Sequence, residues 1–245
     1  MKADPQVQRR LLDLQAIDTA LAQLAHRRRA LPERAELEAL ARELSALEDE
    51  RVRAQVAVDD LDRDIARIEK DVDQVRARKA KDEDRLAAGT GPARELEALQ
   101  HELVSLNRRQ SDLEDAELEL MEQRETAQSV LDGVEQRLAE ARERRAATEQ
   151  RRDDSLGEIG REEEFKRSAR QPLANDLPAD LVQLYDRIRT DTGLGAALLA
   201  AGRCGGCRLE LSGADLARIR KAAADEVVRC EDCRRIMVRT NESGL

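Results

Sequence analysis

Aromatic side chains are almost absent from this sequence of 245 residues, which has one Phe, one Tyr and no Trp. A thick globular core normally uses aromatic volume to fill its centre. Charged residues make up 39% of the chain, and Ala, Leu, Glu and Arg are abundant. Apolar burial must therefore take place along a narrow seam, and the composition favours an elongated, mainly helical protein.

Long apolar runs are missing as well. The chain opens on Met1-Lys2-Ala3-Asp4-Pro5, and no stretch of 18 apolar residues occurs anywhere. We therefore expect neither a signal peptide nor a membrane span, and a cytoplasmic protein without a membrane partner. The four cysteines fall into two pairs, which in a cytosolic chain favours metal binding over disulfides.

The net charge of −9 argues against nucleic-acid binding by bulk electrostatics. The distribution of charge is uneven, however. Residues 202–245 contain nine Lys and Arg against seven Asp and Glu, a net charge of +2. The C-terminal end is therefore weakly basic on an acidic chain.

A heptad pattern organises the middle of the chain. From Leu37 to Leu86, apolar residues recur at alternating spacings of three and four, with polar exceptions at Arg51, Lys79 and Asp82, and the pattern resumes at Leu96. The break between them is Gly89-Thr90-Gly91-Pro92. Such a seam needs a partner helix, so the two arrays predict an antiparallel coiled-coil hairpin with its tip near residues 87–93.

The hairpin prediction carries an approximate register. The expected neighbours are Val75 with Leu106, Leu61 with Leu120 or Met121, and Leu44 with Leu138. An intramolecular hairpin buries its own seam and predicts a monomer, although the same helices could exchange between two chains to form a dimer.

The rest of the chain predicts shorter elements. A first helix over 5–29 meets the outward arm of the hairpin, a helix over 32–86, at a kink near 30–32, because Pro32 disfavours helical geometry in the preceding residue. The return arm runs from 93 to about 168, with a flexible or splayed base after Ala141 where Gly157 and Gly160 weaken the helix. Arg170-Gln171-Pro172 is expected to end this arm.

A helix from 178 to 190, a strand over 196–201 and a helix over 214–223 that is capped by Ser212 complete the prediction. We expect a coiled-coil hairpin domain over 1–170 and a linker helix with a zinc ribbon over 171–245. The fold class is mainly α, with a small C-terminal α+β ribbon.

The strongest chemical signal is a pair of CxxC motifs. Cys204-Gly205-Gly206-Cys207 is followed, after 22 residues, by Cys230-Glu231-Asp232-Cys233. Each motif offers two sulfurs to a tetrahedral Zn²⁺ ion at about 2.3 Å. Disulfides would need an oxidising compartment, and an iron–sulfur cluster is unusual at this spacing. Four thiolates leave no open coordination position, so we expect one structural, non-catalytic zinc ion.

Basic residues surround these motifs in the sequence. The candidates for contact with nucleic acid or another partner are Arg203, Arg208, Arg218, Arg220, Lys221, Arg234, Arg235 and Arg239. Those beside the cysteines could instead offset the negative charge of a four-thiolate site. The ribbon has no aromatic residue for stacking bases, so any nucleic-acid contact would be mainly to phosphate.

Four stretches of the sequence resemble the bacterial C4-type zinc-ribbon family that carries a long N-terminal coiled-coil hairpin. They are Pro92 to Glu102 at the tip, the helix from Leu177 to Arg189, the first CxxC with Gly202, and Cys230 to Val238. The family usually has Pro and Gly in the second motif where this chain has Glu231 and Arg234. The resemblance implies no enzymatic activity. It implies nucleic-acid binding in general, and adaptor or chaperone roles in secretion and flagellar systems for some members.

The sequence therefore supports two alternative functions. In the first, the ribbon binds nucleic acid. In the second, the protein is an adaptor or chaperone-like scaffold that binds protein through the ribbon and the tip. The candidate tip contacts are Arg94, Glu95, Glu97 and His101. No phosphate-binding or dinucleotide-binding glycine motif is present, and His26 and His101 read as exposed helical positions. We therefore expect neither enzymatic activity nor a small-molecule substrate.

Overall fold

A computed structural model describes residues 1–245, and it confirms the predicted fold class. The elements in chain order are α1 (Pro5–Arg29), α2 (Pro32–Ala88), α3 (Ala93–Asn175), α4 (Ala179–Thr192), β1 (Ala196–Ala200), β2 (Arg203–Cys204), α5 (Gly213–Lys221), β3 (Val228–Arg229) and β4 (Ile236–Val238). The chain forms two compact units. One is Ala35–Glu149, and the other joins Met1–Arg34 to Gln150–Leu245.

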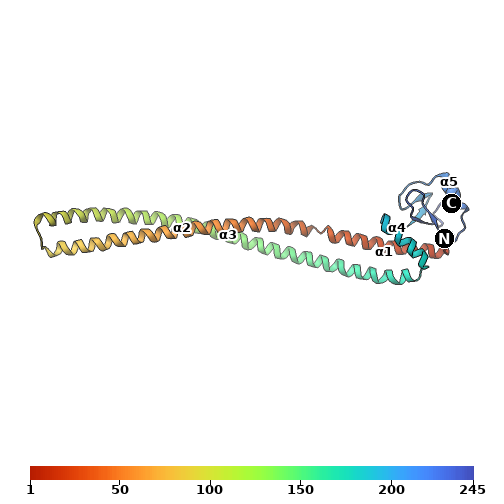
Figure 1. The fold of residues 1–245 in the computed structure, drawn as a ribbon, viewed down its shortest axis with the longest axis horizontal. Coiled ribbons are helices and arrows are strands. Elements are labelled where there is room, and N and C mark those ends of the chain that lie inside the picture. Colours follow the sequence, from red (N-terminus) through yellow and green to blue (C-terminus); the bar gives the residue numbers. More distant parts are fainter. The chain divides into compact units, whose positions relative to one another are not determined.

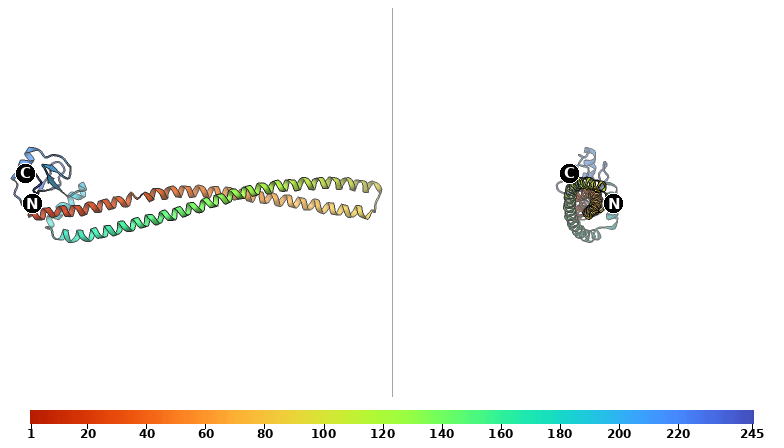
Figure 2. Two further views of the ribbon diagram at one scale, coloured as in Figure 1. Left: turned by 180° about the vertical axis from the view of Figure 1, so that it is seen from behind. Right: turned by 90° about the vertical axis from the view of Figure 1, so that its left-hand side faces the viewer.

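The first unit is the antiparallel hairpin, in which α2 and α3 lie side by side (Figure 1). Two further views show the same pairing (Figure 2). The turn between the arms uses Gly89 with φ of +62° and Gly91 with φ of +155°. Glycine adopts these angles without the steric cost that a Cβ would bring. Pro92 directly precedes α3, where its missing N–H would have no helical partner.

The seam of the hairpin buries small clusters of apolar residues. Leu47, Leu138 and Ala141 form one cluster, and Leu44 packs against it. This confirms the expected neighbourhood of Leu44 and Leu138. A second cluster contains Ala54, Val58 and Leu131, with Ala127 packed against it.

Two other expected neighbours test the register nearer the tip. Val75 and Leu106 both line a groove of about 420 Å³, as expected. Asp62 pairs with Arg124 at 3.0 Å, which brings the residues around 124 to the level of Leu61. The register there is about one helical turn from the predicted pairing of Leu61 with Leu120 or Met121.

Ion pairs between the arms follow the heptad. Arg144 pairs with Glu43 and Arg137 with Glu50, both at 2.6 Å and one heptad apart on each arm. These side chains are exposed, so each pair contributes about 1 kcal/mol at most. Their repeated spacing specifies the register more than it adds stability.

The second unit contains the joint between the first helix and the start of α2. Helix α1 ends at Arg29 and α2 begins at Pro32, which confirms the predicted kink. Leu31 lies between them and is buried in a cluster with Leu24 and Ile159. This contact holds the joint against the returning helix.

One expectation for the return arm was wrong, and one stays a prediction. Helix α3 is continuous through Gly157 and Gly160. The expected flexibility or splaying of the base stays a prediction. Ile159 is fully buried between the two glycines, and its packing offsets their weak helix propensity. The helix also passes through Pro172 to Asn175, because Leu173 and Ala174 pack against the main core of this unit.

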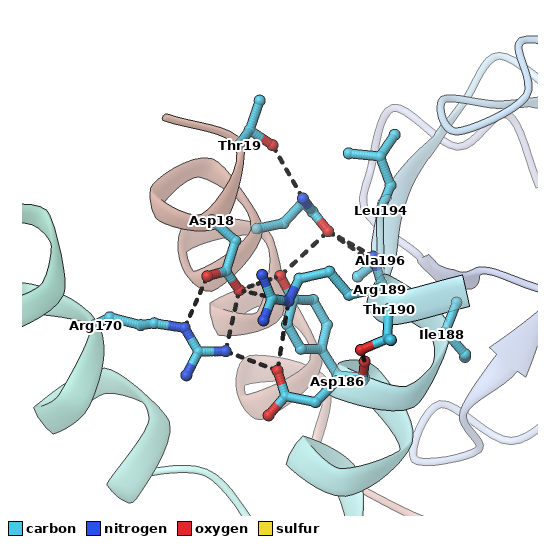
Figure 3. A network of polar contacts seen from close by, with 12 residues as sticks. Asp18, Thr19, Arg170, Asp186, Ile188, Arg189, Thr190, Leu194 and Ala196 are labelled. Carbon is cyan, nitrogen blue, oxygen red and sulfur yellow. Dashed lines mark hydrogen bonds and ion pairs between the residues drawn. The ribbon is translucent and has the colours of Figure 1, made fainter. Parts of the chain in front are cut away.

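A partly buried polar network joins α1, α3 and α4 at this base (Figure 3). Arg170 of α3 donates to both carboxylate oxygens of Asp18, at 2.7 and 3.2 Å, and to Asp186 at 2.7 Å. The Tyr185 hydroxyl donates to Asp18 at 2.8 Å. Hydrogen bonds to Asp18, opposed by desolvation, raise the pKa of Arg170. Burial first, and then Asp18, raise the pKa of Tyr185 far above its usual value.

Gln15 links this network to the first strand. Its side-chain oxygen accepts from the backbone N–H of Gly195 at 2.7 Å and of Ala196 at 3.3 Å. The same oxygen lies 3.2 Å from the Tyr185 hydroxyl oxygen, whose single proton is shared with the nearer Asp18 carboxylate at 2.8 Å. The start of β1 is thereby tied to α1 and α4.

The ribbon contains a four-stranded sheet in the order β2-β1-β4-β3. Strand β1 confirms the predicted strand; it pairs in parallel with β4 and antiparallel with β2. The N-terminus pairs beside β3, since Ala3 N–H donates to Asp225 O at 2.7 Å and Val227 N–H donates to Met1 O at 3.1 Å. Helix α5 is capped by Ser212, as predicted, and ends at Lys221.

Candidate metal centre

The first cysteine pair lies in a tight turn after β2. Cys204 ends the strand and is fully buried, and the backbone N–H of Arg208 donates to its carbonyl at 2.7 Å. Gly205 is needed here for space, because a Cβ on it would lie 2.7 Å from the Leu198 carbonyl oxygen. The turn therefore presses directly on strand β1.

The second cysteine pair repeats this turn after β3. The backbone N–H of Arg234 donates to the Cys230 carbonyl at 3.0 Å, and Cys230 N–H donates to Arg235 O at 3.0 Å. The residue after each pair is an arginine in the left-handed region: φ is +68° at Arg208 and +62° at Arg234. Arg234 thus adopts a backbone conformation that glycine would adopt with less strain.

The two turns bring the four sulfur atoms together. All four lie within 4.8 Å of one another. Cys204 Sγ is 3.8 Å from Cys233 Sγ, and Cys207 Sγ is 3.9 Å from Cys230 Sγ. Sulfurs at the corners of a tetrahedron with Zn–S bonds of about 2.3 Å are about 3.8 Å apart. These separations are too long for disulfides, so the four cysteines fit one Zn²⁺ ion.

The surroundings of the thiols affect their ionisation when no metal is bound. Burial raises the pKa of Cys204, and it raises that of Cys230 to about 12. Burial also disfavours the thiolate at Cys233, but hydrogen bonds from the Arg235 backbone N–H and from the other thiols outweigh it and lower the pKa to about 7. Zinc must therefore displace protons from buried thiols, which makes its binding pH-dependent.

Two of the eight candidate cations have structural partners. Arg239 lies at the end of α5, where it donates to the carbonyl oxygens of Ile219, Ala222, Ala223, Ala224 and Glu226. Arg235 donates to Thr192 O at 2.8 Å, and its side chain covers Gly206. These contacts give both arginines a structural role, although the Nε atom of Arg235 is buried without a hydrogen-bond partner.

The other six cations are exposed on the ribbon. Arg203 pairs with Glu210 at 3.6 Å. Arg218 and Arg234 share Glu231, at 3.0 and 3.6 Å. Arg208, Arg220 and Lys221 form no ion pair. The ribbon therefore presents basic side chains that are free or only weakly paired.

The candidate tip residues lie in the hairpin unit. Arg94, Glu95, Glu97 and His101 are all exposed on the first turns of α3, and none forms an ion pair. Glu95 occupies the first helical turn, where a negative charge is favourable. That position gives Glu95 a structural reason to be acidic.

Sequence reasoning missed the network around Asp18. One signal was available, because Asp18 follows Leu14 by four residues and so lies on the apolar face of α1. Its partners Arg170 and Asp186 come from distant helices and could not be inferred from spacing.

The fold and the sulfur cluster together define a coiled-coil hairpin protein with a C4 zinc ribbon. Residues 14–193 match the CT398-like coiled coil hairpin domain family, and residues 203–237 match the C4-type zinc ribbon domain family. The chain belongs to the CT398-like coiled coil hairpin family. Both family descriptions are of structural domains and neither names an enzyme.

Relatives from other bacteria support this assignment. The Mycobacterium tuberculosis protein Rv2229c is 41% identical over 98% of both chains, and Mycobacterium leprae ML1638 is 30% identical over 87% of this chain and 92% of its own. A solved Mycobacterium smegmatis structure is 35% identical, has a TM-score of 0.86, and matches over 98% of this chain and 100% of its own.

A more distant structure supports the fold alone. CT398 from Chlamydia trachomatis is 20% identical with a TM-score of 0.65, and the match covers 96% of this chain and 98% of that one. Separately, none of the helices has a segment apolar and long enough to cross a bilayer.

Proposed function

We propose that this protein is a non-enzymatic binding protein whose zinc ribbon contacts the phosphates of nucleic acid. The observation that carries the proposal is the pair of arginines that follow the cysteine motifs. Arg208 and Arg234 are exposed and have positive φ angles, which cost a non-glycine residue roughly 1–2 kcal/mol. An arginine at both positions, where glycine would be less strained, is consistent with a use for the side chains themselves.

Other features of the ribbon support contact with phosphate rather than with bases. Arg220 and Lys221 are exposed without an ion pair, and the pairs of Arg203 and Arg218 are exposed, so phosphate could displace their carboxylates. No aromatic residue occurs in 202–245 to stack on a base. Binding would therefore be insensitive to sequence and steeply dependent on salt.

The test is a fluorescence anisotropy titration of zinc-loaded protein against labelled single-stranded RNA and DNA at several salt concentrations. The double variant Arg208→Gly with Arg234→Gly should keep its fold, because glycine accepts positive φ. We expect it to lower the slope of log K against log salt by about 1.4, since each phosphate contact on a single strand contributes about 0.7.

The matched control is Arg53→Gln on α2, an exposed arginine without an ion pair, which should bind as the wild type does. Zinc content reports whether each variant is folded. Absence of binding by the zinc-loaded wild type at low salt would end the proposal.

A second function, that of a protein-binding adaptor, is favoured by the tip. The glycines and Pro92 account for the turn, whereas Arg94, Glu97 and His101 are exposed, unpaired and not required by it. Crosslinking mass spectrometry in cells, comparing wild type with Arg94→Ala and Glu97→Ala, tests this function. If the wild type and the two variants crosslink to the same proteins, the tip is not an interaction site.

A further inference from the structure

An apolar patch lies on the outer face of α3 within the hairpin unit. Leu118 is 59% exposed and Met121 is 50% exposed, and their spacing of three puts them side by side on one helix face. Val104, which is 69% exposed, lies two heptads before Leu118 and so occupies the same heptad position. Outer positions of a coiled coil are normally polar, so neighbouring large apolar residues indicate a surface that is covered in use.

Unpaired carboxylates run beside this patch. Asp112, Asp115, Glu119 and Glu122 are spaced by three, four and three residues, which aligns them along the helix. All four are exposed, and none of their carboxylates forms a hydrogen bond or ion pair. Like charges at these spacings destabilise a helix, so the isolated protein carries this stripe at a cost.

The opposite arm does not neutralise the stripe. Arg76 of α2 pairs with Glu114 at 2.7 Å, while Arg63 and Arg67 pair with aspartates of their own helix. From Asp112 to Glu125, α3 carries seven carboxylates and one arginine, Arg124, which pairs with Asp62. The negative charge is therefore available to a partner.

We propose that this face of α3, the patch of Val104, Leu118 and Met121 with its acidic stripe, docks a basic amphipathic helix of another protein. The apolar side of such a helix would cover Leu118 and Met121, and its flanking Lys or Arg residues would meet the carboxylates. Methionine suits this role, since its flexible side chain adapts to the partner surface. A second copy in an isologous dimer would instead place the acidic stripes against each other. The inference is independent of what the ribbon or the tip binds.

The experiment uses the full zinc-loaded chain and a designed peptide of about 20 residues, roughly 30 Å long as a helix. The peptide has leucines on one face and lysines beside them, and binding is measured by isothermal titration calorimetry. We expect the variant Leu118→Gln with Met121→Gln to raise Kd about tenfold. The control is Val52→Gln with Val56→Gln, two exposed valines four residues apart on α2 (52% and 49% exposed). This double variant should change Kd less than about twofold.

Two further measurements distinguish docking of the peptide from nonspecific charge attraction. A peptide of the same composition with a scrambled order should bind about tenfold more weakly. The variant Asp115→Asn with Glu122→Gln should weaken the designed peptide and reduce its salt dependence. Circular dichroism checks that every variant stays helical.

Equal binding of the peptide by wild type and by Leu118→Gln with Met121→Gln would overturn the proposal, as would equal binding of the scrambled peptide. Wild-type self-association in analytical ultracentrifugation that this variant abolishes would also overturn it, because a second copy would then cover the patch.

Discussion

The same substitution at two buried aspartates should have opposite effects on stability. The Asp18 side chain is 2% exposed and accepts hydrogen bonds from Arg170 and Tyr185. The Asp82 side chain is 7% exposed at an inward-facing heptad position, and its Oδ2 atom has no partner. Its Oδ1 atom is 3.8 Å from Arg85, which is 59% exposed.

Asp82→Leu should stabilise the hairpin by about 1–3 kcal/mol, because it removes a buried acceptor without a partner. Asp18→Leu should destabilise its unit by about 3–5 kcal/mol, because Arg170 and the Tyr185 hydroxyl then lose their shared acceptor. The exposed Asp84→Leu is the control for the mutation itself, with a change of at most about 0.5 kcal/mol.

Urea unfolding followed by circular dichroism at the helix band measures all three variants, and hydrogen exchange assigns each change to its unit. Local protection near the tip should rise in Asp82→Leu, and protection in α4 should fall in Asp18→Leu. A lower free energy of unfolding for Asp82→Leu than for the wild type would refute the reasoning, because the unpaired Asp82 carboxylate would then not destabilise the hairpin.

Two other perturbations have definite expected outcomes. Hydrogen bonding to Arg51 lowers the pKa of Glu48 below 4.5. The ionised Glu48 side chain therefore stabilises the folded protein above pH 4.5, and this stabilisation is lost as the pH falls through the pKa of Glu48 in the folded state. Glu48→Gln should therefore flatten the fall of melting temperature with acidification, whereas Glu135→Gln, an exposed residue without a partner, should not. Gly205→Ala should destabilise the ribbon by about 1–3 kcal/mol, because its Cβ would meet the Leu198 carbonyl at 2.7 Å. Chelator competition would show this as weaker zinc retention, and unchanged retention would contradict it.

The hairpin could be predicted because its determinants are local and periodic. Heptad spacing, the Gly-Thr-Gly-Pro break and the CxxC motifs each report on residues close in sequence. The exact register was less accessible, since ion pairs such as Asp62 with Arg124 connect residues that no sequence pattern links. The extension of α3 past Pro172 was missed because packing of Leu173 and Ala174 against the core overrides the helix-breaking tendency of the proline.

In the candidate site, the cysteine ligands could be predicted from the sequence, whereas the roles of the arginines could not. The cysteine quartet follows from composition and spacing alone. The roles of the arginines do not: Arg235 and Arg239 bind backbone carbonyls, and only the folded chain reveals which carbonyls lie within reach. The positive φ of Arg208 and Arg234 likewise depends on the three-dimensional turn.

Metal content, measured by native mass spectrometry on the purified full chain, tests most directly whether the sulfur quartet organises the ribbon. One zinc ion per chain is expected in the wild type, and Cys230→Ser should lose the metal together with amide protection in β3 and β4. A wild-type chain that binds no zinc yet keeps a protected ribbon would contradict this.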